Sequence, residues 1–410
     1  MFRHLHIPYR NERWLVGLAD AGLRTVSVLG WPRARPQSAA PRRILLLRLE
    51  KVGDLVMVLE AIGMVKAFAP DALIDLVVGS WNRDLAGLIP GVHIETLDVP
   101  WIARKGHGMS WPDLMHRARA WRLEEYDLAI NFEPDIRSNL LLALSGASRR
   151  VGFVSGGGGA LLTDGISPDP RAHIADNAKA LVARAFATTG LKPRATGETD
   201  KAVARDFNKP VAQGVSPVKL HIPDAARRRA ADLIATPRHG APLVGIQPAT
   251  GRRVKEWDPV RFAEVGAALA RTRGATVVLI GSDADKPVLD AVRAAWPNDV
   301  PLAHLQTDVD LVVLSAVLER LSLLITGDTG PMHLAAAVGT PVLAIFGPSL
   351  PTRYAPLSPR SRIVRIDIHC SPCNLMRQPP ERCVGHVPDC LTGISAAEVL
   401  RVANEMLNAP

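Results

Sequence analysis

The chain repeats one pattern, a short uninterrupted apolar run followed by a segment of helical periodicity, and it does so in two separate stretches. Short continuous apolar runs are typical of strands buried on both faces of a sheet, and such strands occur in parallel sheets covered by helices. The pattern therefore predicts an α/β chain with two doubly wound sheets. The expected strands span 44–47, 73–78, 128–132, 150–154, 243–247, 276–280, 323–326 and 342–346.

Helices are expected between these strands, and a polar stretch over 192–214 separates the two groups of strands. We therefore divide the chain into a basic amphipathic arm with a linker over 1–41, a first α/β domain over 42–205 and a second over 206–410. The expected helices span 55–68, 112–123, 138–144, 173–187, 259–271, 286–295, 310–318, 331–338 and 396–407.

The formal net charge of +9 is concentrated in the arm. The residues up to Arg43 include eight arginines and two acidic residues, which account for +6, whereas the remaining chain carries only +3. Aromatic residues make up 5% of the chain and no DNA-binding motif is present, so we expect no nucleic-acid partner. An anionic membrane surface is a better match for a basic terminal segment.

Apolar residues recur at helical spacing over 12–30. Either an interfacial helix on a membrane or a helix packed on the protein's own surface would show this pattern. The segment does not resemble a secretory signal, and the longest uncharged stretch, 329–352, contains four prolines, so we expect a cytoplasmic protein without a transmembrane helix.

Three loops follow expected strands and combine glycine with charged residues: 50–54, 247–257 and 326–333. Ligands of open α/β sheets bind beyond the carboxyl ends of strands, so each loop is a candidate site. Asp54 taken alone fits either a helix N-cap or a catalytic carboxylate. The cationic second loop suits a phosphorylated ligand, although a solvated basic loop is the alternative, and the third loop opens a helix whose N-terminus can bind an anion.

The motifs in these loops resemble those of glycosyltransferase family 9, which contains the ADP-heptose:lipopolysaccharide heptosyltransferases. The resemblance runs from about Arg42 to Ala403 and implies a GT-B fold, in which two doubly wound domains face each other across a cleft. The first domain would bind the acceptor and the second the nucleotide sugar. The motifs are Gly53-Asp54, Arg150-Val151-Gly152-Phe153, Pro248 to Trp257, Gly327-Asp328-Thr329-Gly330-Pro331-Met332-His333, Gly339-Thr340-Pro341 and Phe346-Gly347-Pro348.

The resemblance also implies roles for individual residues. Asp54 would be the general base that takes the proton of the acceptor hydroxyl in an inverting transfer. Lys255 would bind the donor diphosphate and neutralise its growing charge, a task that replaces a catalytic metal ion in such enzymes. The other residues expected to bind the nucleotide sugar are Thr250, Asp283, Asp328, Thr329, Gly330 and His333.

The function implied is the transfer of heptose, or a similar sugar, from an ADP-sugar to a lipopolysaccharide core or other glycolipid acceptor. The enzyme would be peripheral at the cytoplasmic face of the inner membrane, held there through its basic arm. Two alternatives stay open: the same fold acting on a protein or another polysaccharide, and an inactive nucleotide-sugar-binding module.

All four cysteines fall within a short segment before the last expected helix. In a reducing compartment such a cluster is either a metal site or a set of free thiols. The protein heptosyltransferases of autotransporters, which are related to this family, use a cysteine cluster to hold iron. A structural zinc or iron ion is therefore one expectation and unliganded thiols are the other, while catalysis itself would need no cofactor. The candidate ligands are Cys370, Cys373, Cys383 and Cys390.

Overall fold

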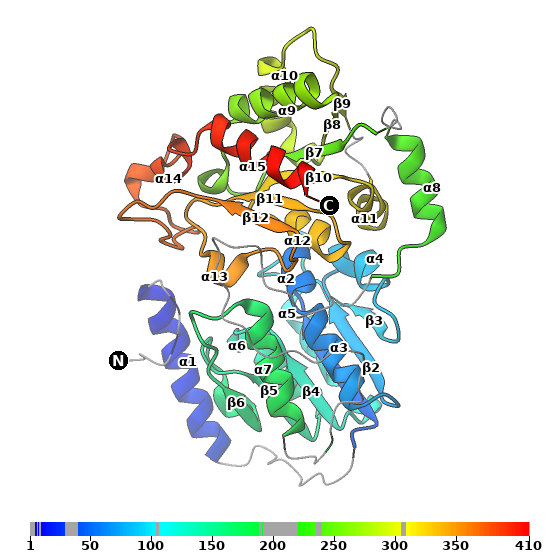
Figure 1. The fold of residues 1–410 in the computed structure, drawn as a ribbon. Coiled ribbons are helices and arrows are strands. Elements are labelled where there is room, and N and C mark those ends of the chain that lie inside the picture. Colours follow the sequence, from blue (N-terminus) through cyan, green and yellow to red (C-terminus); the bar gives the residue numbers. More distant parts are fainter. Residues whose placement is uncertain are drawn as a thin grey trace. The chain divides into compact units, whose positions relative to one another are not determined.

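The computed structural model divides the chain into two compact units, Met1–Asp200 and Lys201–Pro410. Each unit contains one parallel sheet with helices packed on it (Figure 1). The polar connection expected over 192–214 and most of the linker expected at the end of the arm, before residue 42, lie outside the described residues. The structure describes residues 5, 7, 10–28, 40–103, 106–187, 191, 220–234, 240–304 and 309–409.

The sheet of the first unit has six parallel strands in the order β3-β2-β1-β4-β5-β6. Because β1 and β4 are neighbours, the winding of the chain reverses between them, and the register pairs Leu47 with Asn131 at their carboxyl ends. The residues that follow these two strands therefore meet at one point of the sheet edge. The strands are β1 (Arg43–Arg48), β2 (Leu73–Val78), β3 (His93–Thr96), β4 (Leu128–Asn131), β5 (Arg149–Phe153) and β6 (Asp164–Ile166).

Helices cover this sheet, and the helix expected over 55–68 is in fact two helices, because Val58 departs from helical geometry with φ −103° and ψ 2°. On one face α3 packs against α7, where the rings of Phe68 and Phe186 stack with centroids 4.7 Å apart. The α-helices of the unit are α1 (Arg10–Val28), α2 (Val52–Met57), α3 (Leu59–Phe68), α4 (Arg83–Ala86), α5 (Trp111–Ala120), α6 (Ile136–Leu144) and α7 (Ile174–Phe186).

The arm helix α1 packs on the first unit, against the short 3-10 helix Gly159–Leu161. Asp20 of α1 is 2% exposed, and its carboxylate accepts the backbone N–H of Gly158 at 2.8 Å. A Cβ at Gly157 would lie 2.7 Å from Cγ1 of Val16, so this glycine allows α1 to approach closely. The helix therefore packs on the protein's own surface, which is the second of the two alternatives predicted for this segment. None of the described helices has the length and hydropathy needed to cross a membrane.

The sheet of the second unit also has six parallel strands, in the order β12-β11-β10-β7-β8-β9. Here the winding reverses between β7 and β10, and Gln247 pairs with Thr326 at their carboxyl ends. The strands are β7 (Leu243–Gln247), β8 (Thr276–Leu279), β9 (Ala303–His304), β10 (Leu323–Gly327), β11 (Val342–Ile345) and β12 (Ser361–Val364).

The helix after β7 shows how local sequence sets these elements. Asp258 caps α9 by accepting the N–H of Val260, Pro259 occupies the first turn, and Gly274 ends the helix at φ 62°. Trp257, just before the cap, is fully buried in the core. The α-helices of the unit are α8 (Asp224–Leu233), α9 (Pro259–Arg273), α10 (Lys286–Ala295), α11 (Leu311–Glu319), α12 (Gly330–Ala337), α13 (Pro351–Tyr354), α14 (Asp389–Thr392) and α15 (Ala396–Asn408).

Candidate functional site

In the first unit the candidate base Asp54 lies in the first turn of α2, directly beyond the carboxyl end of β1. The N-cap position of α2 belongs to Lys51, and no side chain forms a cap hydrogen bond there. The carboxylate of Asp54 instead lies 3.3 Å from the guanidinium of Arg48 and is 30% exposed. Asp54 is thus partly accessible and paired with a cation, and the N-cap alternative is wrong.

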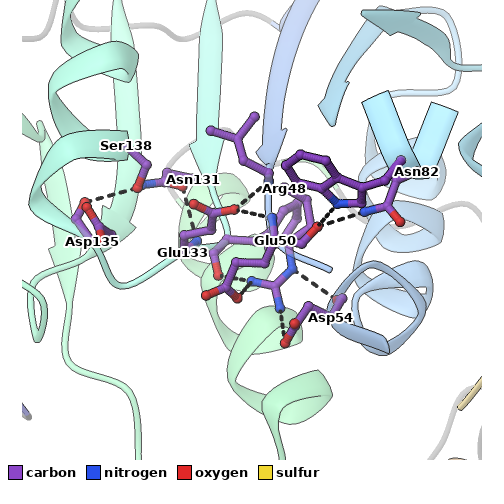
Figure 2. Close-up of polar contacts among 11 residues, drawn as sticks. Arg48, Glu50, Asp54, Asn82, Asn131, Glu133, Asp135 and Ser138 are labelled. Atoms are coloured by element: carbon purple, nitrogen blue, oxygen red, sulfur yellow. Dashed lines mark hydrogen bonds and ion pairs between the residues drawn. The ribbon is translucent and has the colours of Figure 1, made fainter. Parts of the chain in front are cut away.

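Arg48, the last residue of β1, is only 1% exposed and is surrounded by oxygen acceptors (Figure 2). Its Nε donates to the carbonyl of Asp54 at 3.0 Å and its Nη1 to the carbonyl of Phe132 at 3.0 Å. Its Nη1 also lies 3.4 Å from the carboxylate of Glu50. A buried charge is costly unless it is paired and hydrogen-bonded, and Arg48 meets both conditions through the loop that carries Asp54.

Glu133 follows β4 and occupies the other side of this switch point (Figure 2). It is 2% exposed, and its Oε1 accepts the backbone N–H groups of Leu49 and, at 2.9 Å, Glu50. Burial raises the pKa of Glu133 to about 7, although the charge of Arg48 and the N–H of Leu49 act in the opposite direction. A buried carboxyl group with a raised pKa therefore lies at the start of the loop that carries the candidate base.

The loop between β1 and α2 is held from a third strand as well. The carbonyl of Glu50 accepts Nε1 of Trp81 at 3.0 Å and Nδ2 of Asn82 at 2.7 Å, both from the segment after β2. Contacts from β1, β2 and β4 thus fix this loop at the carboxyl edge, which is the edge where ligands of such sheets bind.

In the second unit Lys255 and Asp328 meet at the other switch point. Nζ of Lys255 donates to the backbone carbonyl of Asp328 at 2.6 Å and to its carboxylate at 3.1 Å, and the lysine side chain is 13% exposed. The hydroxyl of Ser349, which follows β11, donates to the same carboxylate. An ammonium group has three donors, so Lys255 can hold these two contacts and still donate to a ligand.

Thr250 lies close to the same pair, 8% exposed, and its hydroxyl donates to the carbonyl of Arg252 at 2.9 Å. A Cβ at Gly327 would lie 2.6 Å from Cγ2 of Thr250. Only glycine at position 327 therefore lets the loops after β7 and β10 approach this closely.

The remaining predicted donor-site residues are in the first turns of α12 and in the segment after β8. Thr329 and Gly330 form the N-terminus of α12, where backbone N–H groups are not used within the helix. His333 is in the same helix and 4% exposed. Asp283 is exposed on the 3-10 helix after β8, the strand next to β7. The structure thus brings Lys255 into contact with Asp328 and Thr250 close to Gly327, while Asp283 follows a neighbouring strand and Asp54 belongs to the first unit.

Arg48, Glu133 and Ser349 are not among the site residues predicted from the sequence. Arg48 was visible only as a charge at the end of an apolar run, and Glu133 as an acid just after one. The signal that could have identified them is a pair of charged residues at the carboxyl ends of two neighbouring strands. The order of the strands in the sheet, however, could not be predicted from the sequence.

The four cysteines lie in the second unit and are unbridged. Burial, together with the other three thiols, raises the pKa of Cys390 to about 11, so the cysteines lie near one another. Yet within the described part of the chain, no three His, Cys, Asp or Glu side chains are grouped as a metal ion requires. The thiols as placed do not fit a metal ion, and metal binding by them stays a prediction.

Comparison with known proteins adds independent findings. The model of the family "Glycosyltransferase family 9 (heptosyltransferase)" matches residues 115–383. Lipooligosaccharide heptosyltransferase 2 of Haemophilus influenzae is 26% identical over 340 residues, 79% of this chain and 88% of the relative. The solved structure of E. coli ADP-heptose LPS heptosyltransferase II aligns with a TM-score of 0.69 at 21% identity, covering 89% of this chain and 98% of that one.

A second solved structure is the iron-containing dodecameric glycosyltransferase TibC from enterotoxigenic E. coli, with a TM-score of 0.51 at 17% identity, covering 90% of this chain and 76% of that one. At these sequence identities the two solved structures support the fold alone. They confirm the α/β class with two doubly wound sheets that the sequence predicts.

Proposed function

The chain belongs to glycosyltransferase family 9 and is a glycosyltransferase, and from this premise we propose that it transfers heptose from ADP-heptose to a lipopolysaccharide core acceptor. The observation that carries the proposal is the match to lipooligosaccharide heptosyltransferase 2 over 79% of the chain. The sites at both switch points support it, because one offers a partly exposed carboxylate and the other a cation beside a helix N-terminus.

Asp54 is the proposed general base. Its carboxylate takes the proton of an acceptor hydroxyl while that oxygen attacks the anomeric carbon of the heptose. A glycosidic C–O bond forms, the bond between the sugar and the diphosphate breaks, and ADP leaves on the opposite face. The configuration at the anomeric carbon is therefore inverted.

The second unit is the proposed donor site. Lys255 and the free N–H groups at the start of α12 compensate the negative charge that develops on the departing diphosphate. Thr250 and Thr329 add contacts to phosphate oxygens, and Asp283 bonds the ribose hydroxyls. Asp328 holds Lys255 in place and, with Gly330 and His333, contacts the sugar, an assignment that rests on position in the loop after β10.

The arm supports peripheral association with the cytoplasmic face of a membrane. While Asp20 anchors α1 to the first unit, the apolar residues Leu15 and Leu18 are 71% and 59% exposed, and Trp14 is 43% exposed. Arg10 and Arg13 belong to the same helix, and the excess of arginine in the arm would supply attraction to anionic lipid headgroups. The glycolipid acceptor would then be presented to an enzyme already held at the membrane surface.

The test of the proposed function is ADP release from ADP-heptose, measured with and without a lipopolysaccharide core acceptor lacking heptose. Asp54→Asn keeps the shape of the side chain but removes the base, so turnover should fall roughly 10²- to 10⁴-fold while donor affinity persists. Asp71→Asn, at an exposed aspartate of the same unit, is the matched control. Acceptor-dependent ADP release only with a protein or another polysaccharide would reject the lipopolysaccharide acceptor, and unchanged turnover of Asp54→Asn would reject the base.

A further inference from the structure

The carboxylates of Glu50 and Asp54 both pair with the guanidinium of Arg48 at the switch point of the first unit, and the charge of Arg48 also acts on a third carboxylate, that of Glu133 (Figure 2). Those of Asp54 and Glu50 are 30% and 31% exposed, whereas Glu133 is 2% exposed. Glu133 is therefore too deeply buried to touch an acceptor sugar. Whatever it contributes to the reaction must pass through its neighbours.

Glu133 holds the backbone at the start of the loop that carries Asp54. Its Oε1 accepts the N–H groups of Leu49 and Glu50, the first two residues of the loop between β1 and α2. Its own N–H is fixed by Oδ1 of Asn131 at 3.1 Å. The carboxylate thus connects the ends of β4 and β1 and sets where the loop begins.

Glu133 also acts on Arg48 through its charge. The charged groups that face Glu133 are Arg48 from β1 and Asp135 from its own loop, and Asp135 is itself bonded by Arg137 at 2.9 Å. Those that face Arg48 are Glu50, Asp54 and Glu133. Arg48 is therefore paired with two acids and acts through its charge on a third, so a change of charge on one acid alters the attraction of Arg48 for the others.

We propose that Glu133 is a positioning residue for Asp54, fixing the start of its loop and competing with it for the charge of Arg48. The proposal rests on the proposed function, since it requires Asp54 to be the base. When Glu133 is ionised, Arg48 holds the Asp54 carboxylate less strongly and Asp54 is the stronger base. When Glu133 is neutral, Arg48 stabilises ionised Asp54 and weakens it as a base.

Two substitutions separate the two roles. Glu133→Gln keeps the shape and an oxygen acceptor for the loop but removes the charge, whereas Glu133→Asp keeps the charge and shortens the reach. In the wild type kcat/KM should rise through a limb near pH 7, where burial places the pKa of Glu133. Glu133→Gln should lack that limb and be roughly three- to tenfold slower at pH 8. Glu133→Asp should keep the limb but have a lower kcat at every pH.

The control is Asp164→Asn, a partly buried carboxylate of the same unit that pairs with Arg149 on β5. Its pH profile should superimpose on that of the wild type. A wild-type limb near pH 7 in Glu133→Gln, or a wild-type kcat in Glu133→Asp, would overturn the proposal.

The proposed function fails if the wild type itself releases no ADP. A measurement that does not depend on turnover therefore tests the role of Glu133 separately. The ¹⁵N resonance of Arg48 Nε, assigned by its loss in Arg48→Lys, should titrate near pH 7 in the wild type and stay constant in Glu133→Gln. A resonance that does not titrate in the wild type, or titrates equally in both proteins, would refute the electrostatic coupling between Glu133 and Arg48.

Discussion

Replacing Glu133 by glutamine should make the protein more stable, and increasingly so as the pH rises. Burial raises the pKa of Glu133 from 4.5 to about 7 in the folded protein, so the folded state binds this proton more tightly than the unfolded chain does. Stability must then fall as the pH rises from about 4.5 through about 7, because only the unfolded state gains the full benefit of ionisation. Glutamine has no such penalty.

The size of the effect follows from the two pKa values. Their difference corresponds to about 3 kcal/mol in total, most of which falls between pH 5 and pH 8. For a unit of about 200 residues, each kcal/mol corresponds to roughly 2–4 °C in Tm. The Tm of Glu133→Gln minus that of the wild type should therefore grow by roughly 5–10 °C between pH 5 and pH 8.

Scanning calorimetry of both proteins at several pH values measures this difference, and titrations common to both cancel. Asp164→Asn is the control: burial raises the pKa of Asp164, but the hydrogen bond and charge of Arg149 outweigh it and hold the pKa below its usual value. Asp164 is thus ionised from pH 5 to pH 8 in both states, and its Tm difference should stay constant. A constant difference for Glu133→Gln as well would refute the account of its burial.

Two further predictions concern the donor site and the arm. Lys255→Ala should weaken ADP binding roughly 10- to 150-fold by calorimetry, because a hydrogen bond to a charged group contributes about 1.5–3 kcal/mol; unchanged ADP affinity would contradict its role. Replacing Leu15 and Leu18 by glutamate should abolish sedimentation with anionic vesicles. The same replacement of Leu73 and Leu123, exposed leucines elsewhere in the first unit, should not, and equal losses in the two double variants would mean that charge alone governs binding.

The interior of each sheet could be predicted from the sequence, and its margins could not. The eight expected strands are all present within a residue or two of their predicted bounds, because strands covered on both faces must be continuously apolar. The unpredicted strands are those at the two edges of each sheet, β3, β6, β9 and β12. Such strands are short and partly polar: His93–Thr96 has no fully buried residue. Their apolar signal is therefore weak, and only pairing with a neighbour defines them.

The candidate site divides in the same way. Asp54 and Lys255 follow strands at positions where motifs mark them, so the sequence alone suffices to nominate them. Arg48 and Glu133 lie 85 residues apart and meet only because β4 inserts beside β1. A contact that depends on strand order leaves no local pattern, and the groups that adjust a catalytic residue are mostly of this kind.

Each switch point holds a cation with little solvent exposure that is paired with a carboxylate: Arg48 with Asp54, and Lys255 with Asp328. Buried ion pairs add little to stability, since desolvation offsets most of their attraction, so their presence at these two points has to be explained by what they do. Under the proposed reaction each pair changes in a definite direction. A diphosphate at the donor site competes with Asp328 for Lys255, whereas a proton arriving on Asp54 removes the charge that pairs with Arg48 and leaves Glu50 as its partner. In both units the acid keeps the cation in position, and the reaction weakens that pairing, by a competing anion at Lys255 and by protonation of the acid at Arg48.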